Sequence, residues 1–344
     1  MDLSPAASWS APASWQKMTV IDSHTGGEPF RVVVDGLPPI PGNTVMERRQ
    51  YAIENLQALR RATIWEPRGH PDMYGGWLGD PVEPDSDISV LFVHNEGFST
   101  MCGHGIIALT KIVLEMGILP TIGRETTIGI DTPAGQVRAT ATMKDGVITT
   151  VRFLNVASFA AELDAEVDVP GFGHLQFDLG YGGGFYAYVE ASVIGQDLDD
   201  TASLIINGRQ IKQAIMSSTS ITHPDDDDLG FLYGVIFIGP PMNPRNHSRN
   251  VCVFANGEVD RSPTGTGVSG RLALLHARGA IGLGDQVTIE SITGSEFVGR
   301  VVNETSVGGL RAIVPEITGQ AYILGRSEYW FDPADHIGSG FMLR

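Results

Sequence analysis

One segment of this chain occurs twice, and the repetition constrains the fold more than any other feature of the sequence. Residues 102–117, CGHGIIALTKIVLEMG, align without a gap with residues 264–279, TGTGVSGRLALLHARG. Two pairs of aligned glycines fall in a turn, and a third pair falls where a left-handed glycine would end a helix. Apolar residues surround the intervening helix almost completely in the first copy and less fully in the second. Each copy therefore predicts a buried helix that begins at a Gly-rich turn.

The flanks of the two copies are also similar. Upstream, residues 89–98 (SVLFVHNEGF) resemble residues 250–259 (NVCVFANGEV), and each run is β-branched and aromatic. Downstream, residues 126–137 (TTIGIDTPAGQV) resemble residues 287–298 (VTIESITGSEFV). Each half therefore predicts a strand, a Gly-rich turn, a buried helix, a glycine stop and a second strand.

A chain of 344 residues is long enough for two domains. We predict an α+β fold of two similar domains, each a strongly curved sheet around one central helix. Residues 1–17 would form a flexible arm, residues 18–185 with 325–344 the first domain, and residues 186–324 the second. If the halves are related by a pseudo-twofold axis, two helix N-termini point at one small ligand. Each offers free N–H groups and about half a positive charge, which suit a carboxylate.

Composition narrows the class of ligand. The formal net charge is −17, which argues against a nucleic-acid partner. No apolar run approaches the ~20 residues of a membrane span, and residues 1–17 lack the features of a secretory signal. The two cysteines, Cys102 and Cys252, make no metal-type spacing and fit a reducing compartment. We predict a cytoplasmic protein with a small-molecule ligand, no nucleic-acid partner and no membrane partner.

Three motifs in order, DSHTGGEPFRVV at 22–33, MCGHG at 101–105 and DRSPTGTG at 260–267, together resemble the proline racemase family. The resemblance covers residues 18–340. It implies the fold of diaminopimelate epimerase, in which two pseudo-symmetric, mostly antiparallel domains enclose the active site in the cleft between them. It also implies a homodimer. No Gly-rich segment has the pattern of a dinucleotide site or of a P-loop, so we expect catalysis without a metal ion or organic cofactor.

The resemblance assigns the two N-terminal turn residues to the chemistry. In racemases of this family both turns carry a cysteine: one thiolate removes the α-proton of proline, and the opposite thiol returns a proton to the other face. Cys102 matches the first and would be the proton acceptor, its thiolate favoured by the helix N-terminus. Thr264 replaces the second cysteine, as in the trans-3-hydroxy-L-proline dehydratase branch of the family.

A hydroxyl is a far weaker acid than a thiol, whose pKa is about 8.5. Thr264 therefore cannot readily return a proton, and the resemblance implies a lyase. Cys102 would take the α-proton and the 3-hydroxyl would leave as water, giving Δ1-pyrroline-2-carboxylate. The acid that protonates the leaving oxygen is open between the newly formed Cys102 thiol, His104 and water. Alternative functions are a proline or 4-hydroxyproline racemase/epimerase, and a non-catalytic imino-acid-binding protein.

By the same resemblance, Gly103, His104, Gly265 and Thr266 would bind the substrate carboxylate, and Asp260 would accept a hydrogen bond from the ring ammonium. We expect Cys252, within an apolar strand, to be a core residue. Other polar residues receive lesser roles: shaping the cleft wall (Asp22, His24 and Glu28), lining the cleft (His70) and forming a solvated acidic loop (residues 223–230).

Overall fold

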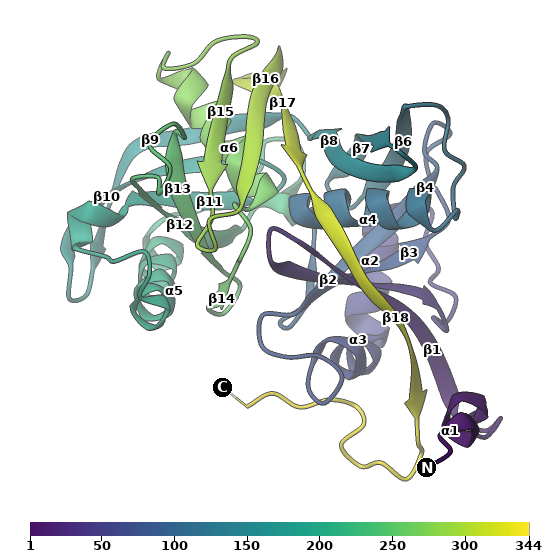
Figure 1. Cartoon of the computed structure of the whole chain (residues 1–344). Helices are drawn as coiled ribbons and strands as arrows, with labels where there is room; N and C mark the ends of the chain where they lie inside the picture. Colours follow the sequence, from purple (N-terminus) through teal and green to yellow (C-terminus); the bar gives the residue numbers. More distant parts are fainter. Residues whose placement is uncertain (344) are drawn as a thin grey trace.

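The protein has two similar halves, and in each half curved strands surround one central helix (Figure 1). The computed structural model describes residues 1–343. The elements in the first part of the chain are α1 (Ser4–Ser8), β1 (Gln16–Thr25), β2 (Glu28–Asp35), α2 (Val45–Asn55), α3 (Gln57–Ile64), β3 (Tyr74–Gly79), β4 (Ile88–His94), β5 (Phe98–Ser99), α4 (Gly103–Glu115), β6 (Glu125–Thr132), β7 (Gly135–Lys144) and β8 (Val147–Leu154).

The second part of the chain repeats this mixture of strands and helices. Its elements are β9 (Ser158–Val169), β10 (Gly173–Tyr181), β11 (Phe185–Glu190), the 3-10 helix η1 (Ala191–Ile194), α5 (Thr201–Ser218), the 3-10 helix η2 (Asp227–Leu229), β12 (Leu232–Gly239), β13 (Ser248–Phe254), β14 (Glu258–Val259), α6 (Gly265–Ala277), β15 (Gln286–Glu290), β16 (Glu296–Val307), β17 (Leu310–Gly319) and β18 (Ala321–Phe331). The α+β class predicted from the sequence is confirmed.

The strand pairing repeats together with the sequence. β4 pairs antiparallel with β5 and parallel with β6, and β13 pairs in the same two ways with β14 and β15. Further upstream, the pairs β1–β2 (antiparallel), β2–β3 (parallel) and β3–β4 (antiparallel) recur as β10–β11, β11–β12 and β12–β13. The duplication is therefore present in the fold and extends beyond the segments whose sequences are visibly similar.

The two central helices are α4 and α6, as predicted. Residues 103–114 of α4 are all buried, and strands β1, β2, β7, β8 and β18 pack around it. Helix α6 is buried over most of its length against β9, β10, β16 and β17. Gly117 and Gly279 follow the two helices with φ of +70° and +71°, the left-handed conformation expected of these stops.

The packing around these helices also shows where the chain passes from one half to the other. β9 and β10 contact α6, the central helix of the second half, so the chain passes from the first half to the second between β8 and β9. It returns between β17 and β18, because β18 pairs with β1 and packs on α4. The domain limits at 185 and 325 stay predictions.

Trp9 in the N-terminal arm contacts the rings of Trp15 and Trp330. No helix within residues 1–343 is both long and apolar enough to cross a bilayer.

Helices α4 and α6 meet at their N-termini. A Cβ atom added to Gly103 would lie 2.6 Å from the Cα of Gly265, and one added to Gly265 would lie 2.7 Å from the Cα of Gly103. Both positions therefore require a residue without a side chain. Because the contact joins the two halves, it fixes the distance between the two helix ends.

Replacing Gly103 by Ala should push the two helix ends apart. An added methyl group in a closely packed interior costs about 1–3 kcal/mol, so we expect the free energy of unfolding in urea to fall by that amount. Gly97→Ala is the matched control, because a Cβ there meets nothing within 4 Å and should change stability by less than about 0.5 kcal/mol. Equal stability of the two variants would contradict this close contact.

Candidate active site

The residues that cap α4 and α6 differ in conformation as well as in chemistry. Cys102 caps α4 with an extended backbone, and its Sγ accepts a hydrogen bond from the N–H of Gly105 at 3.3 Å. Thr264 caps α6 at φ +65°, a left-handed value that costs a β-branched residue about 1–3 kcal/mol. Its side chain makes no capping bond. The approximate symmetry of the two halves is thus broken at the two residues expected to face the substrate.

The hydroxyl of Thr264 donates a hydrogen bond to a neighbouring carboxylate. The hydroxyl donates to Oδ2 of Asp260 at 2.8 Å, and the N–H of Ser262 donates to Oδ1 at 2.7 Å. Both Thr264 and Asp260 are buried. The Thr264 hydroxyl hydrogen therefore points toward Asp260.

A small cavity lies between the two helix N-termini. It is lined by Tyr74, Met101, Cys102, Gly103, His104, Tyr186, Tyr233, Phe254, Asp260, Thr264, Gly265 and Thr266. All seven residues assigned to the site from the sequence are in this set. With a volume of about 20 Å³ it has room for little more than one water molecule.

Four of the lining residues offer backbone N–H groups. The first N–H groups of a helix have no partner inside the helix. Those of Gly103 and His104 in α4, and of Gly265 and Thr266 in α6, are therefore suited to an anion bound between the helix ends.

The expected effect of the helix end on Cys102 is outweighed by burial. The sequence suggests a thiolate, and the N–H of Gly105 does act to lower the pKa of Cys102. Burial of the sulfur is the larger influence, and Asp260 and Glu28 add to it, so the pKa lies well above its ordinary value. In this closed conformation Cys102 is a neutral thiol, and the prediction of a thiolate is wrong for it.

His104 is neutral for the same physical reason. Burial lowers its pKa, which Asp260 and a hydrogen bond to the Pro29 carbonyl raise to a smaller extent. Its Nδ1 and Nε2 atoms lie 3.4 and 3.6 Å from the Sγ of Cys102. The cavity thus holds a thiol and a neutral imidazole in contact.

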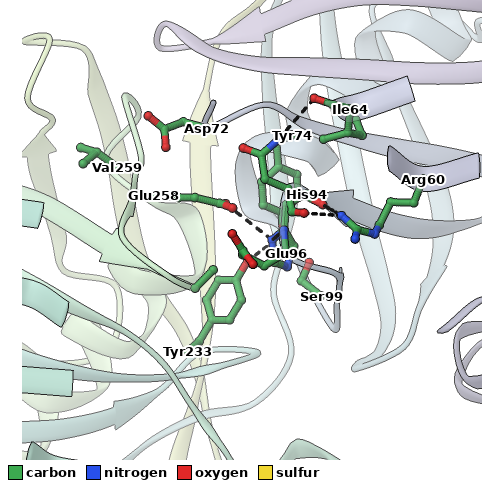
Figure 2. Close-up of polar contacts among 12 residues, drawn as sticks. Arg60, Ile64, Asp72, Tyr74, His94, Glu96, Ser99, Tyr233, Glu258 and Val259 are labelled. Carbon is green, nitrogen blue, oxygen red and sulfur yellow. Dashed lines mark hydrogen bonds and ion pairs between the residues drawn. The ribbon is translucent and has the colours of Figure 1, made fainter. Parts of the chain in front are cut away.

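Aromatic residues that the sequence analysis did not identify also line the cavity. The hydroxyl of Tyr74 shares hydrogen bonds with Ser99 and, at 3.0 Å, with the hydroxyl of Tyr233. Figure 2 shows these rings beside a buried pair from opposite halves, His94 and Glu258, whose Nδ1 and Oε2 atoms are 3.5 Å apart. Tyr74 and Tyr233 come from β3 and β12, equivalent strands of the two repeats, so their contact joins the halves beside the cavity.

Comparison with known proteins identifies the family. Residues 20–342 match the family model described as proline racemase. The chain belongs to the proline racemase family. A relative named trans-3-hydroxy-L-proline dehydratase, from Colwellia psychrerythraea, is 46% identical over 333 residues, covering 96% of this chain and 94% of the relative. Another, named 3-hydroxyproline 2-epimerase, from Burkholderia multivorans, is 43% identical and covers 96% of this chain and 99% of its own.

A solved structure of this family supports the fold. The hydroxyproline epimerase from Agrobacterium vitis, with bound trans-4-hydroxy-L-proline, has a TM-score of 0.91 and 32% sequence identity, and the match covers 96% of each chain. The predicted fold is thereby confirmed. The homodimer and the cytoplasmic location stay predictions.

The polar residues that received lesser roles in the sequence analysis do not line this cavity. Asp22 pairs with Arg31 at 2.7 Å, and the ring of His24 stacks on Tyr322. His70 is exposed and is not among the residues that line this cavity. Cys252 is a buried residue of the core, as predicted.

The acidic loop contains the exposed residues Asp225, Asp227 and Asp228. Within residues 1–343 no group of three or more His, Cys, Asp or Glu side chains is arranged to hold a metal ion.

Glu28 connects the first motif to the loop that carries Asp260. Its side chain is fully buried, and its Oε2 accepts a hydrogen bond from the N–H of Arg261 at 2.7 Å. Burial, together with the nearby charge of Asp260, raises the pKa of Glu28 well above 4.5. The carboxyl therefore keeps its proton to a higher pH in the folded protein than an exposed glutamate does.

Replacing Glu28 by Gln should remove a pH dependence of stability. Because the pKa of Glu28 is raised on folding, the folded state binds more protons than the unfolded state above pH 4.5, and stability falls as pH rises. We expect the free energy of unfolding of Glu28→Gln, relative to that of the unchanged protein, to increase between about pH 5 and pH 8. Urea unfolding across this range tests it, and a constant difference would contradict it.

Proposed function

We propose that this protein is a trans-3-hydroxy-L-proline dehydratase. Relatives named for this activity are 41–46% identical to the chain over nearly its whole length. The single observation that carries the proposal is Thr264, which stands at the N-terminus of α6 where the family's racemases have their second cysteine and donates its hydroxyl hydrogen to Asp260.

In the proposed complex the substrate carboxylate lies between the two helix ends. The N–H groups of Gly103 and His104 on one side, and of Gly265 and Thr266 on the other, neutralise its charge and make the α-proton easier to remove. Asp260 accepts a hydrogen bond from the ring ammonium. These roles are supported by the shared lining of one cavity by all five residues.

The reaction then needs one base. Cys102, as thiolate, takes the α-proton, and electrons of the broken C–H bond form a double bond to C3 while the C3–O bond breaks. The departing oxygen takes up a proton and leaves as water. The enamine tautomerises to Δ1-pyrroline-2-carboxylate. No proton has to reach the opposite face of the ring, so an alcohol at position 264 is no obstacle.

Epimerisation is the second candidate, because relatives named 3-hydroxyproline 2-epimerase and hydroxyproline epimerase share the family and fold. It requires a second acid on the face opposite Cys102. Thr264 is the residue at that position, and an aliphatic hydroxyl that already donates to a carboxylate is a poor proton donor to a carbanion. A non-catalytic imino-acid-binding protein, the third alternative, would not require a thiol at position 102 in contact with His104.

Substitutions at position 264 should separate elimination from inversion. Thr264→Ala should keep dehydration within about tenfold of the unchanged enzyme, because the hydroxyl does no chemistry. Thr264→Cys should gain inversion at the α-carbon, because a thiol then faces each side of the ring. Imine trapped with 2-aminobenzaldehyde measures dehydration, and chiral chromatography of recovered imino acid measures inversion.

Cys102→Ser should lower dehydration by a factor of at least about 10² to 10⁴, the contribution typical of a positioned acid or base. Cys252→Ser is the matched control, since Cys252 is a core residue, and it should keep the activity of whatever fraction folds. Unchanged turnover of the Cys102 variant would overturn the proposed function.

A further inference from the structure

Cys102 and His104 are in contact on one wall of the cavity. The Sγ atom lies at nearly the same distance from both nitrogens of the ring, 3.4 Å from Nδ1 and 3.6 Å from Nε2. One ring nitrogen carries a hydrogen and donates to the Pro29 carbonyl. The other nitrogen has the lone pair and can accept the thiol hydrogen at this distance.

The imidazole is held by several neighbours. Its ring packs edge-on against Phe30, with ring centres 5.8 Å apart, and against Tyr74, with ring centres 5.0 Å apart. The hydroxyl of Thr25 donates to the carbonyl of His104 at 2.9 Å. Two residues of the first motif, Thr25 and Phe30, thus fix the position of His104 next to the thiol.

The stereochemistry of the proposed substrate decides which wall must supply the acid. In trans-3-hydroxy-L-proline the carboxylate and the hydroxyl are on opposite ring faces, so the α-hydrogen and the hydroxyl are on the same face. An acid for the leaving oxygen must therefore lie on the same side as Cys102. Thr264 and Asp260 belong to the other half of the molecule and to the opposite face.

Two titratable groups of the cavity wall lie beside Cys102 in its own half, namely His104 and Tyr74. The Tyr74 hydroxyl is shared with Ser99 and Tyr233, and burial raises its pKa well above 10, which makes it a weak donor. His104 is the better-matched acid, because an imidazolium is close to neutral pH in acidity.

Resting on the proposed dehydration, we infer that Cys102 and His104 work as one acid–base pair in which His104 protonates the leaving hydroxyl. On substrate binding the thiol proton moves to the imidazole. The thiolate takes the α-proton, and the imidazolium gives its proton to the departing oxygen as the C3–O bond breaks. Water leaves, and the pair returns to thiol and neutral imidazole with no proton drawn from solvent.

The protonation states of the closed cavity fit this cycle. Burial raises the pKa of Cys102 and lowers that of His104, so the pair rests as thiol and neutral imidazole. This is also the state at the end of a turnover. The ion pair exists only while substrate occupies the site, where two helix ends and a bound carboxylate surround it.

A comparison of two leaving groups tests the inference. Chloride leaves without a proton, whereas hydroxide does not leave readily. The readout is the rate of imine formation from trans-3-hydroxy-L-proline divided by the rate from trans-3-chloro-L-proline. Any change in the fraction of thiolate affects both substrates alike and cancels in this ratio. For His104→Gln we expect the ratio to fall by at least about 10²-fold relative to the unchanged enzyme.

His174→Gln is the matched control, because His174 is exposed and pairs with Glu166 and Asp168 away from the cavity; its ratio should not change. If His104→Gln does not fold, His104→Phe keeps ring packing and carries the same comparison. An unchanged ratio in the His104 variant overturns the inference while leaving the dehydratase intact. Failure of the unchanged enzyme to form imine from the hydroxy substrate would instead overturn the proposed function, and the inference with it.

Discussion

The close contact between the N-termini of α4 and α6 is the constraint on which the rest of the site depends. Gly103 and Gly265 touch backbone to backbone, leaving no room for a side chain between the helices. Two helix ends at this distance concentrate free N–H groups and partial positive charge in one place. Such a site suits a carboxylate. It would also suit a substrate in which the C–H bond to be deprotonated is next to that carboxylate. The curved sheets serve to hold the two helices in this arrangement.

The two halves are similar in the strands and loops that support the site, but they differ at the residues that cap the two central helices. In the scaffold, Asp131 at the end of β6 accepts N–H bonds from residues 82 and 83, and Glu290 at the end of β15 accepts them from residues 242 and 243. At the site, Cys102 contacts His104, whereas Thr264 donates to Asp260. One face of a bound ring would meet a proton acceptor, and the other a hydroxyl whose hydrogen is already committed. Under the proposed function, proton transfer is thereby restricted to one side of the ring.

The sequence was sufficient for the features that depend on local pattern. Aligned glycines and buried helices predicted α4, α6 and their facing ends, and the family motifs brought seven residues to one cavity. Two kinds of feature escaped. Tyr74 and Tyr233 lie on strands whose pattern indicates only a core, and their pairing depends on how the halves close.

The protonation state of Cys102 was also missed. The helix end acts on the thiol as expected, but burial in the closed cavity has the larger effect and raises its pKa. Burial of this kind depends on tertiary packing, which a motif does not report. Likewise, the link between Glu28 and the Arg261 backbone joins residues far apart in the chain and has no signature in either motif.

The most direct test of a one-sided site uses a substrate that cannot eliminate. L-Proline has no leaving group at C3, so a proton removed from it can only be returned. Incubated with the enzyme in deuterium oxide, recovered proline should carry deuterium at the α-carbon with the L configuration retained. Accumulation of deuterated D-proline at a rate comparable with turnover of the hydroxylated substrate would show that a proton is delivered from the Thr264 side, and would contradict the account.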